Sequence, residues 1–220
     1  MIVHIISNFN SMKSYLYLLI LLSLTIYSCK KGTANFVIKG SITDNTFSTS
    51  LTGATVKLFQ TPAGTTQSNL IGTAVIGSDG TYKFEFPRDK MEKYTLVITK
   101  DLYFEINSTI YFSELTIKDD NTRNYSTTAK SWVKLHFVNQ SPSSTSDHLQ
   151  YIKQLGKEGC PECCTDTEQN LYGILDSSIF CINDGNTEYS YMYTVFGTTN
   201  QGIKSVMTVP FDTTELLLYY

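Results

Sequence analysis

From residue 36 onward, apolar and polar positions alternate along much of the chain. In the first such segment, Phe36, Ile38 and Ile42 fall on one side of an extended backbone. A period of two predicts β-strands whose apolar side faces a core. The same pattern recurs at residues 54–60, 70–76, 82–87, 94–98, 104–106 and 109–117. Between two of these runs, Ser78, Asp79 and Gly80 predict a tight turn.

The second half of the chain follows a similar pattern with more interruptions. Residues 131–138 predict a strand that places Val133, Leu135 and Phe137 on one face and Trp132, Lys134 and His136 on the other. Residues 139–147 have loop composition, residues 148–155 and 168–175 predict short helices, and residues 189–196, 203–210 and 216–220 predict a three-stranded meander. The polar stretch 119–128 has the composition of a linker and marks a domain boundary.

The expected fold is therefore mainly all-β, with two tandem β-sandwich-like domains. The first covers residues 35–118 and the second residues 129–220, with a cysteine-containing, short-helical insertion in the second. At 220 residues, the chain is long enough for two cores of this size.

Four motifs in the first half occur in a characteristic order: VIKGSITD, LTGATVKLFQ, GTAVIGSDGTYKFEFP and KYTLVITK. This order resembles the carboxypeptidase-regulatory-like, or transthyretin-like, seven-stranded sandwich. The resemblance covers residues 35–118 and implies a fold, because its motifs are structural. The sequence departs from that family at residues 88–93 (RDKMEK), where a Pro/Gly pair is common before the last strand.

The N-terminal 28 residues have the order of a secretory signal. Lys13 precedes an apolar run at residues 15–26, and the small residue Ser28 stands before Cys29. A run of about twelve residues is shorter than the roughly 18 needed to cross a bilayer. Met12 offers a compact start for this signal, so residues 1–11 are interpreted as an upstream start extension.

Residues 26–29 (IYSC) resemble the lipobox of bacterial lipoproteins. The resemblance implies that the chain is cut before Cys29, that this cysteine is lipidated, and that residues 29–34 form a tether. In lipoproteins of the Bacteroidetes, acidic residues after the lipidated cysteine resemble a surface-export signal. Here the cysteine is followed by Lys30 and Lys31. We therefore expect an outer-membrane lipoprotein and favour the periplasmic side. The alternative is an ordinary signal peptide with an accidental cysteine.

Composition agrees with an exported β protein and excludes one class of partner. Hydrophobic residues make up 41% and charged residues 17%, with 15 Tyr, 12 Phe and one Trp. These values are typical of a globular β domain. The formal net charge is −3, and no basic cluster is present that would attract nucleic acid.

Four further cysteines carry the candidate chemistry. Cys160, Cys163 and Cys164 lie in the motif CPECC, and Cys181 follows downstream. In an oxidising compartment an even number favours disulfides, with three possible full pairings. A bridge from Cys181 to one of the other three would pin the insertion to its domain and contribute about 2–4 kcal/mol.

Two other uses of these cysteines stay open. Cys160, Cys163 and Cys181 with His148 would make a zinc site, since a C-x2-C spacing lets two thiolates bind one ion. Cys160 and Cys163 would alternatively act as attacking and resolving thiols, with the thiolate pKa lowered at a helix N-terminus. The context is unfavourable, because the sequence GKEG precedes Cys160 and no βαβ pattern surrounds it.

Other residues that could form a hydrolytic or calcium site are better explained as parts of strands and turns. His136 and the pair formed by Asp147 and His148 lack the G-x-S-x-G motif of a hydrolase. Residues 119–121 and 183–186 are rich in oxygen ligands, but they lack the spacing of a calcium loop and predict turns.

The leading hypothesis is a non-enzymatic, lipid-anchored binding or structural module without a cofactor. Its expected partners are the membrane, through the lipid on Cys29, and a protein or carbohydrate ligand. One alternative is a tethered thiol-disulfide oxidoreductase that uses Cys160 and Cys163. Another is a fimbrial or assembly subunit that uses the apolar strand at residues 213–220.

The lipid anchor gives the first testable prediction. Labelled palmitate should be incorporated into the wild-type protein, which should fractionate with membranes, because each buried methylene contributes about 0.8 kcal/mol. Cys29→Ala should abolish labelling and release the protein into the soluble fraction. An unlabelled wild type that fractionates like Cys29→Ala would contradict the assignment.

Overall fold

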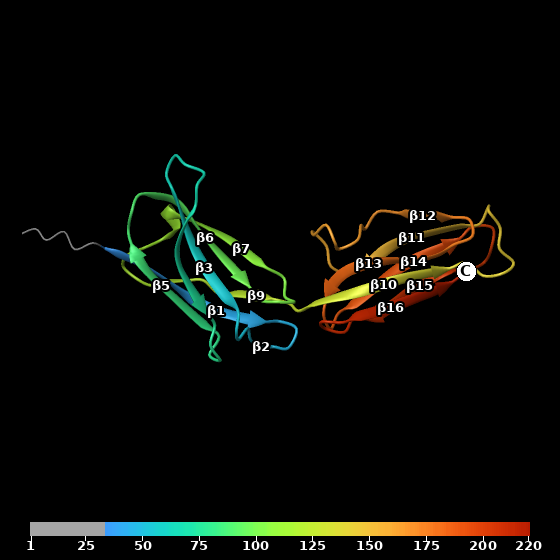
Figure 1. The fold of residues 1–220 in the computed structure, drawn as a ribbon, viewed down its shortest axis with the longest axis horizontal. Helices are drawn as coiled ribbons and strands as arrows, with labels where there is room; N and C mark the ends of the chain where they lie inside the picture. Colours follow the sequence, from blue (N-terminus) through green and yellow to red (C-terminus); the bar gives the residue numbers. More distant parts are fainter. Residues whose placement is uncertain (1–33) are drawn as a thin grey trace, which may run out of the picture. The chain divides into compact units, whose positions relative to one another are not determined.

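The computed structural model describes residues 34–220, and its regular secondary structure is almost entirely β-strand (Figure 1). Cys29 and the expected signal peptide lie outside the described residues. The one helical element in the described part is a 3-10 turn, η1 (Phe112–Glu114). No helix in that part is long and apolar enough to cross a bilayer.

The first sandwich consists of two sheets. One has the order β2-β1-β5, with β8 and β9 also paired to β1, and the other has the order β4-β3-β6-β7. Its strands are β1 (Asn35–Asp44), β2 (Thr49–Ser50), β3 (Thr55–Pro62), β4 (Asn69–Val75), β5 (Thr81–Pro87), β6 (Met91–Thr99), β7 (Ile106–Tyr111), β8 (Asn121–Thr122) and β9 (Tyr125–Thr127).

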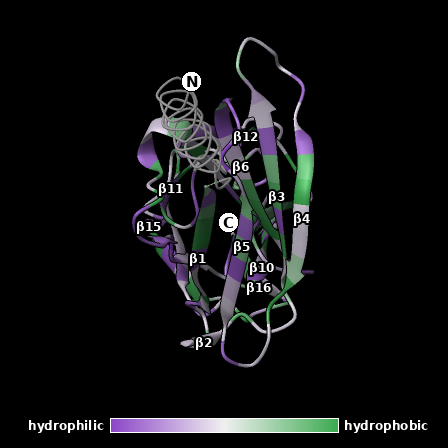
Figure 2. Ribbon diagram, turned by 90° about the vertical axis from the view of Figure 1, so that its left-hand side faces the viewer, coloured by the Kyte–Doolittle hydropathy of each residue, from purple (hydrophilic) through white to green (hydrophobic). Residues whose placement is uncertain are grey.

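Alternation along these strands builds the core, as Figure 2 shows by hydropathy. In β5, Tyr82, Phe84 and Phe86 are buried while the residues between them are exposed. Gly80, at φ +74°, closes the predicted turn before this strand, and its N–H donates to the carbonyl of Gly77 at 3.1 Å. The buried side chains of both sheets form one cluster that includes Phe36, Ile38, Val56, Leu58, Tyr94, Leu96 and Ile98.

The stretch 119–128 is not the linker that its polar composition predicted. Strands β8 and β9 lie within it and pair in parallel with β1. The physical reason is visible at Asn121, whose buried amide donates to the carbonyls of Val37 and Thr116 at 2.9 and 3.0 Å. The polar side chain therefore satisfies backbone groups of the sandwich instead of facing solvent.

A close backbone approach interrupts this parallel pairing at Gly40. The N–H of Arg123 donates to the carbonyl of Lys39 at 2.8 Å. A Cβ atom on Gly40 would lie 1.8 Å from the carbonyl oxygen of Arg123. Only glycine therefore lets the segment between β8 and β9 approach β1.

The second sandwich also has two sheets, with the orders β13-β10-β16 and β12-β11-β14-β15. The first strand, β10, begins three residues after β9 ends. The strands are β10 (Lys130–Val138), β11 (His148–Leu155), β12 (Gln169–Tyr172), β13 (Asp176–Asp184), β14 (Glu188–Val195), β15 (Gln201–Met207) and β16 (Thr213–Tyr219). The mainly all-β fold with tandem sandwiches is thus confirmed.

Both short helices predicted for this half are wrong. The segments 148–155 and 168–175 instead contribute β11 and β12, which pair antiparallel with each other. Along β11, Leu149, Tyr151 and Lys153 are buried and alternate with less buried residues. Because β11 lies between β12 and β14, its backbone N–H and C=O groups find partners on both sides. As a strand it also turns Leu149 and Tyr151 together toward the core.

The predicted meander is only partly correct. Strands β14 and β15 form an antiparallel hairpin, but β16 crosses to the other sheet and pairs in parallel with β10. Leu216 and Leu218 on β16 are buried and join the same cluster as Leu135 and Phe137 on β10. Crossing to this sheet closes the core of the second sandwich.

Gly40→Ala should destabilise the first sandwich by about 1–3 kcal/mol, the range for overpacking, because the obstructing atom belongs to the backbone. Denaturant unfolding measures the loss. Gly72→Ala is the matched control, since its Cβ would meet only the Phe84 ring at 3.4 Å. Equal midpoints for wild type and Gly40→Ala would contradict the close approach.

Candidate functional site

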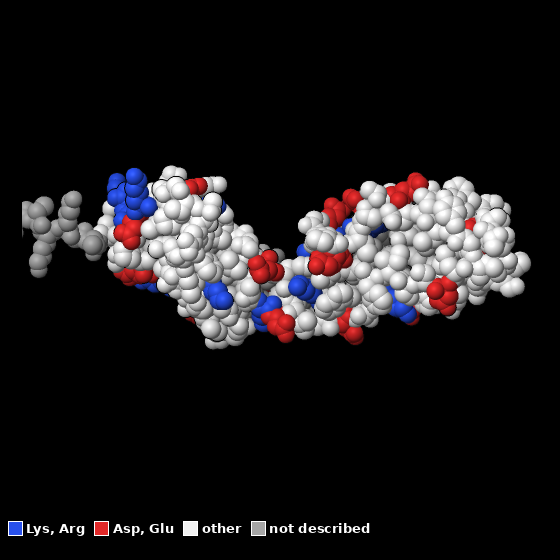
Figure 3. Space-filling view, turned by 45° about the horizontal axis from the view of Figure 1, so that its top comes forward, with Lys and Arg blue, Asp and Glu red and all other residues white. Residues whose placement is uncertain are grey.

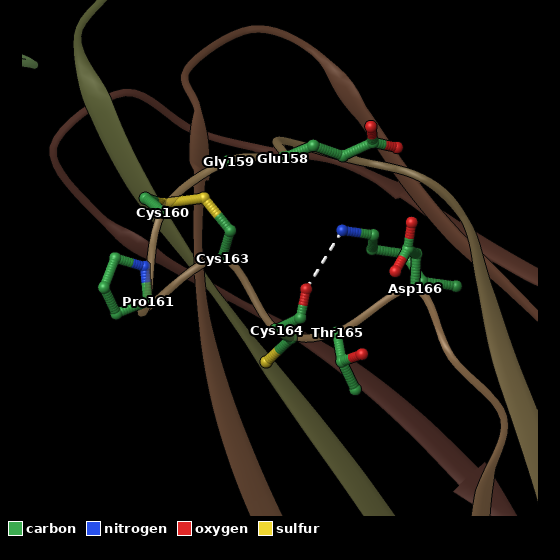
Figure 4. Close-up of a pocket in the computed structure, with 9 residues that line it drawn as sticks. Glu158, Gly159, Cys160, Pro161, Cys163, Cys164, Thr165 and Asp166 are labelled. Atoms are coloured by element: carbon green, nitrogen blue, oxygen red, sulfur yellow. Dashed lines mark hydrogen bonds between the residues drawn. A yellow bond between two sulfur atoms is a disulfide. The ribbon is translucent and has the colours of Figure 1, made fainter.

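The CPECC motif lies in a loop between β11 and β12, at the edge strand β13 (Figure 4). Cys160 is bonded to Cys163, and Cys164 is bonded to Cys181 of β13. The disulfide from Cys181 to the motif predicted by the sequence is thus present, and Cys164 is the partner. This disulfide joins residues 17 apart in sequence, whereas the other joins residues three apart.

The disulfide loop, defined as residues 156–168, covers part of the edge of β13. The N–H of Ile182 donates to the carbonyl of Glu162 at 2.8 Å. The N–H of Lys157 donates to the side-chain oxygen of Asn183 at 2.6 Å. The outward backbone N–H of Ile182, which a second chain would need for strand pairing, is therefore occupied within the molecule.

A buried lysine of β11 donates hydrogen bonds to the disulfide loop. Lys153 is only 7% exposed, and its Nζ donates to the carbonyls of Lys157 and Cys164, both at 3.0 Å. Figure 4 shows the second of these bonds within a hollow of about 570 Å³. The buried ammonium is thus hydrogen-bonded to the loop and contributes to its position.

The zinc alternative is incompatible with this pairing. All four sulfurs are in disulfides, so none is available as a thiolate ligand. His148, the expected fourth ligand, places its Nε2 2.6 Å from the side-chain oxygen of Asn170. In residues 34–220 no group of His, Cys, Asp and Glu is arranged to hold a metal.

The redox alternative assumed a helix that begins at Cys160, and the structure has no helix there. Cys160 was expected at a helix N-terminus, yet the described loop contains a turn in which the N–H of Cys163 donates to the carbonyl of Cys160 at 3.1 Å. The helix dipole that would lower a thiolate pKa is therefore missing from this part of the chain. Cys160 is more exposed than the buried Cys163.

His136 has a structural environment on the outer face of sheet β13-β10-β16. Its Nε2 lies 2.6 Å from Asp176 on β13, and its Nδ1 lies 2.8 Å from Glu215 on β16. These hydrogen bonds, the one to Asp176 foremost, raise the pKa of His136. Lys134 and His136 lower the pKa of Glu215. The histidine therefore joins its own strand to both neighbours, an interaction that weakens as pH rises through its raised pKa.

Strand β16 presents an open edge. The N–H of Tyr220 donates to the carbonyl of Val138 at 3.0 Å, so the backbone of Tyr220 faces β10. Because successive residues of a strand alternate, the backbone groups of Glu215, Leu217 and Tyr219 face away from β10. No other described strand pairs with β16 on that side.

The three other edges of this sandwich are less suited to strand addition. The edge of β13 carries the disulfide loop, and β12 has only four residues. The edge of β15 contains Lys204, a charge with no ion pair in the described residues, whereas the charge of Glu215 on β16 is paired with Lys134 at 2.8 Å. Both β15 and β16 pair with their inner neighbours over seven residues without a register shift, so regularity alone does not separate them.

The sequence located the cysteines and the apolar run at 213–220, but it did not identify which strand edge stays open. The residues that define the edge, Leu217 and Tyr219, resemble ordinary core residues in the sequence. Their position follows only from the crossing of β16 to the second sheet.

No family model matches the sequence, and none of the curated proteins matches it. Among solved structures the chain is similar to the Bacillus anthracis TIE protein, with 12% identity, TM-score 0.36, and coverage of 84% of this chain and 34% of that one. It is similar to a streptococcal ancillary pilin at 11% identity and TM-score 0.36, covering 86% and 63%. The chain thus spans less than two thirds of either protein. It is also similar to GBS52, the minor pilin of Streptococcus agalactiae, at 9% identity and TM-score 0.35, covering 84% and 94%.

The two disulfides should differ in their effect on the edge of β13. Replacing Cys164 and Cys181 with serine should lower the free energy of unfolding by about 2–4 kcal/mol. It should also accelerate hydrogen exchange of the Ile182 N–H, because the loop is released. The matched double variant, Cys160→Ser with Cys163→Ser, should leave that exchange rate near the wild-type value. Equal acceleration in both variants would contradict the assigned role of the Cys164–Cys181 bridge.

Proposed function

We propose that the chain is a non-enzymatic structural subunit of the bacterial cell envelope, anchored by lipid on Cys29. In this proposal the subunit assembles with a second copy by pairing the edges of their β16 strands. The open, regular edge of β16 is the observation that carries the proposal.

The chemistry of this edge favours strand pairing. Leu217 and Tyr219 turn their backbone N–H and C=O groups outward, and unpaired groups of this kind are templates for another strand. Leucine and tyrosine provide apolar and aromatic surface that cross-strand pairs bury. Tyr219 is an exposed large side chain, so part of this surface is still available.

The covered edge of β13 gives the assembly a direction. Since Cys164 and Cys181 hold the disulfide loop beside β13, a partner strand is accommodated more readily at the opposite edge of the sheet. Two copies joined antiparallel at β16 would form a self-complementary twofold interface that closes on itself. The product is therefore a dimer instead of an open filament.

The location of the subunit rests on the sequence. The apolar leader and Cys29 support export and lipidation, and two disulfides are typical of proteins outside the cytoplasm. The resemblance of residues 35–118 to the transthyretin-like sandwich supports a spacer role for the first domain, which would hold the second away from the membrane.

Leu217→Pro should abolish dimerisation, because proline removes an N–H that faces the open edge without removing a bond to β10. Sedimentation of the full chain carrying Cys29→Ala measures the mass without a contribution from lipid or detergent. We expect a dimer for this parent protein and a folded monomer for Leu217→Pro.

Ile203→Pro on β15 is the matched control. The N–H of Thr208 donates to the carbonyl of Thr187 at 2.9 Å, so strand alternation turns the N–H of Ile203 toward the open edge of β15. This variant should stay dimeric. A parent protein that is monomeric throughout the concentration series, or equal dissociation of both variants, would overturn the proposal.

A further inference from the structure

Three rings form a continuous stack on the sheet β12-β11-β14-β15. The imidazole of His148 lies between Tyr172 and Phe196, with both centroid distances 4.3 Å and interplanar angles of 17° and 7°. Strand register positions the stack, because His148 is paired with Tyr172 and its carbonyl accepts the N–H of Phe196 at 2.9 Å. The three side chains come from β11, from β12 and from the residue after β14.

The two outer rings of the stack are open to solvent. Tyr172 is 65% exposed and Phe196 is 48% exposed. Since one face of Tyr172 is against His148 and β12 is the edge strand, the other face of the ring is available to a ligand. The stack restricts the rotation of the tyrosine, so binding would order little additional side-chain motion.

Polar side chains lie next to the stack on the same face of the sheet, beginning at Asn170, two residues before Tyr172 on β12. The side-chain oxygen of Asn170 lies 2.6 Å from Nε2 of His148 and accepts a longer bond of 3.4 Å from Gln150. The amide nitrogen of Asn170 donates to Oε1 of Glu168 at 3.1 Å. These bonds orient an amide and a carboxylate on the segment that leads to Tyr172. Alternate residues of a strand are about 7 Å apart, so Asn170 lies next to a sugar on the ring, whereas Glu168, four residues from Tyr172, is about 13 Å away and would meet a further unit of the same chain.

This combination matches the chemistry of a sugar. A pyranose ring has an apolar C–H face that packs on an aromatic ring, and its hydroxyls both donate and accept hydrogen bonds. The Asn170 oxygen already accepts from His148 and Gln150, so Asn170 offers its second amide N–H as a donor. Glu168 supplies an acceptor. The stack and the polar side chains beside it contain no Lys or Arg, and on the visible surface of the second sandwich the basic groups are scattered and not gathered into a patch (Figure 3). An uncharged ligand is therefore favoured over an anionic one.

We propose that Tyr172, Asn170 and Glu168 form a binding site for a neutral oligosaccharide, with His148 and Phe196 as the support of the tyrosine ring. The site lies at the edge of β12 and does not include β16. It therefore goes beyond the proposed assembly function and does not depend on it.

Isothermal titration calorimetry of the full chain carrying Cys29→Ala tests the site with four probes: cellohexaose, maltohexaose, mannohexaose and chitohexaose. At least one probe should bind, and Tyr172→Ala should weaken that binding about tenfold, the loss expected for one aromatic contact. Asn170→Ala should weaken the same binding. Tyr172→Phe should retain most of it, because the ring face is preserved.

Tyr111→Ala is the matched control, since Tyr111 is 52% exposed on a strand of the first sandwich. Binding should be unchanged in this variant and in Leu217→Pro, which separates the sugar site from the assembly edge. Thermal unfolding should show that all variants remain folded. The proposal is overturned if none of the four probes binds at millimolar concentration, or if Tyr172→Ala binds as tightly as Tyr111→Ala.

Discussion

The pairing of β10 with both of its neighbours is the interaction on which the second half of the molecule depends. All nine residues of β10 pair with β13, and seven of them pair with β16 on the other side. Val133, Leu135 and Phe137 are fully buried beneath this sheet. A strand that is central in this way satisfies its backbone groups and fills the core at once, so the strands on either side are set by its register.

Three other features follow from that register. Cys181 lies opposite Val133, which determines where the disulfide to Cys164 can hold the loop. His136 lies between Asp176 and Glu215, so a single imidazole contacts both neighbouring strands. The parallel course of β16 leaves one of its edges open, while the edge of β13 is occupied. One edge of this sheet is therefore protected and the other is available.

The opposite sheet has a different surface. Its inner face contributes Tyr151 and Tyr191 to the core, whereas His148, one of the less buried positions of β11, stacks with Tyr172 and Phe196. Aromatic side chains thus have two uses in this chain, as core and as surface. Their number in the composition does not separate these uses. The register between β11 and β12 does separate core from surface aromatic side chains, because it brings rings from distant positions in the sequence into a single row.

The sequence by itself determined the β character of the chain, since a period of two is a local property that needs no knowledge of partners. It placed Val133, Leu135 and Phe137 on one face, the turn at Gly80, and a disulfide between Cys181 and the CPECC motif. Only the tertiary structure decided which cysteine is the partner, because three pairings satisfy the same spacing. It also replaced two predicted helices and a predicted linker with strands, since β8, β9, β11 and β12 are stabilised by pairing with other parts of the chain. The open edge of β16 and the stack at His148 are likewise products of long-range register, which local periodicity does not encode.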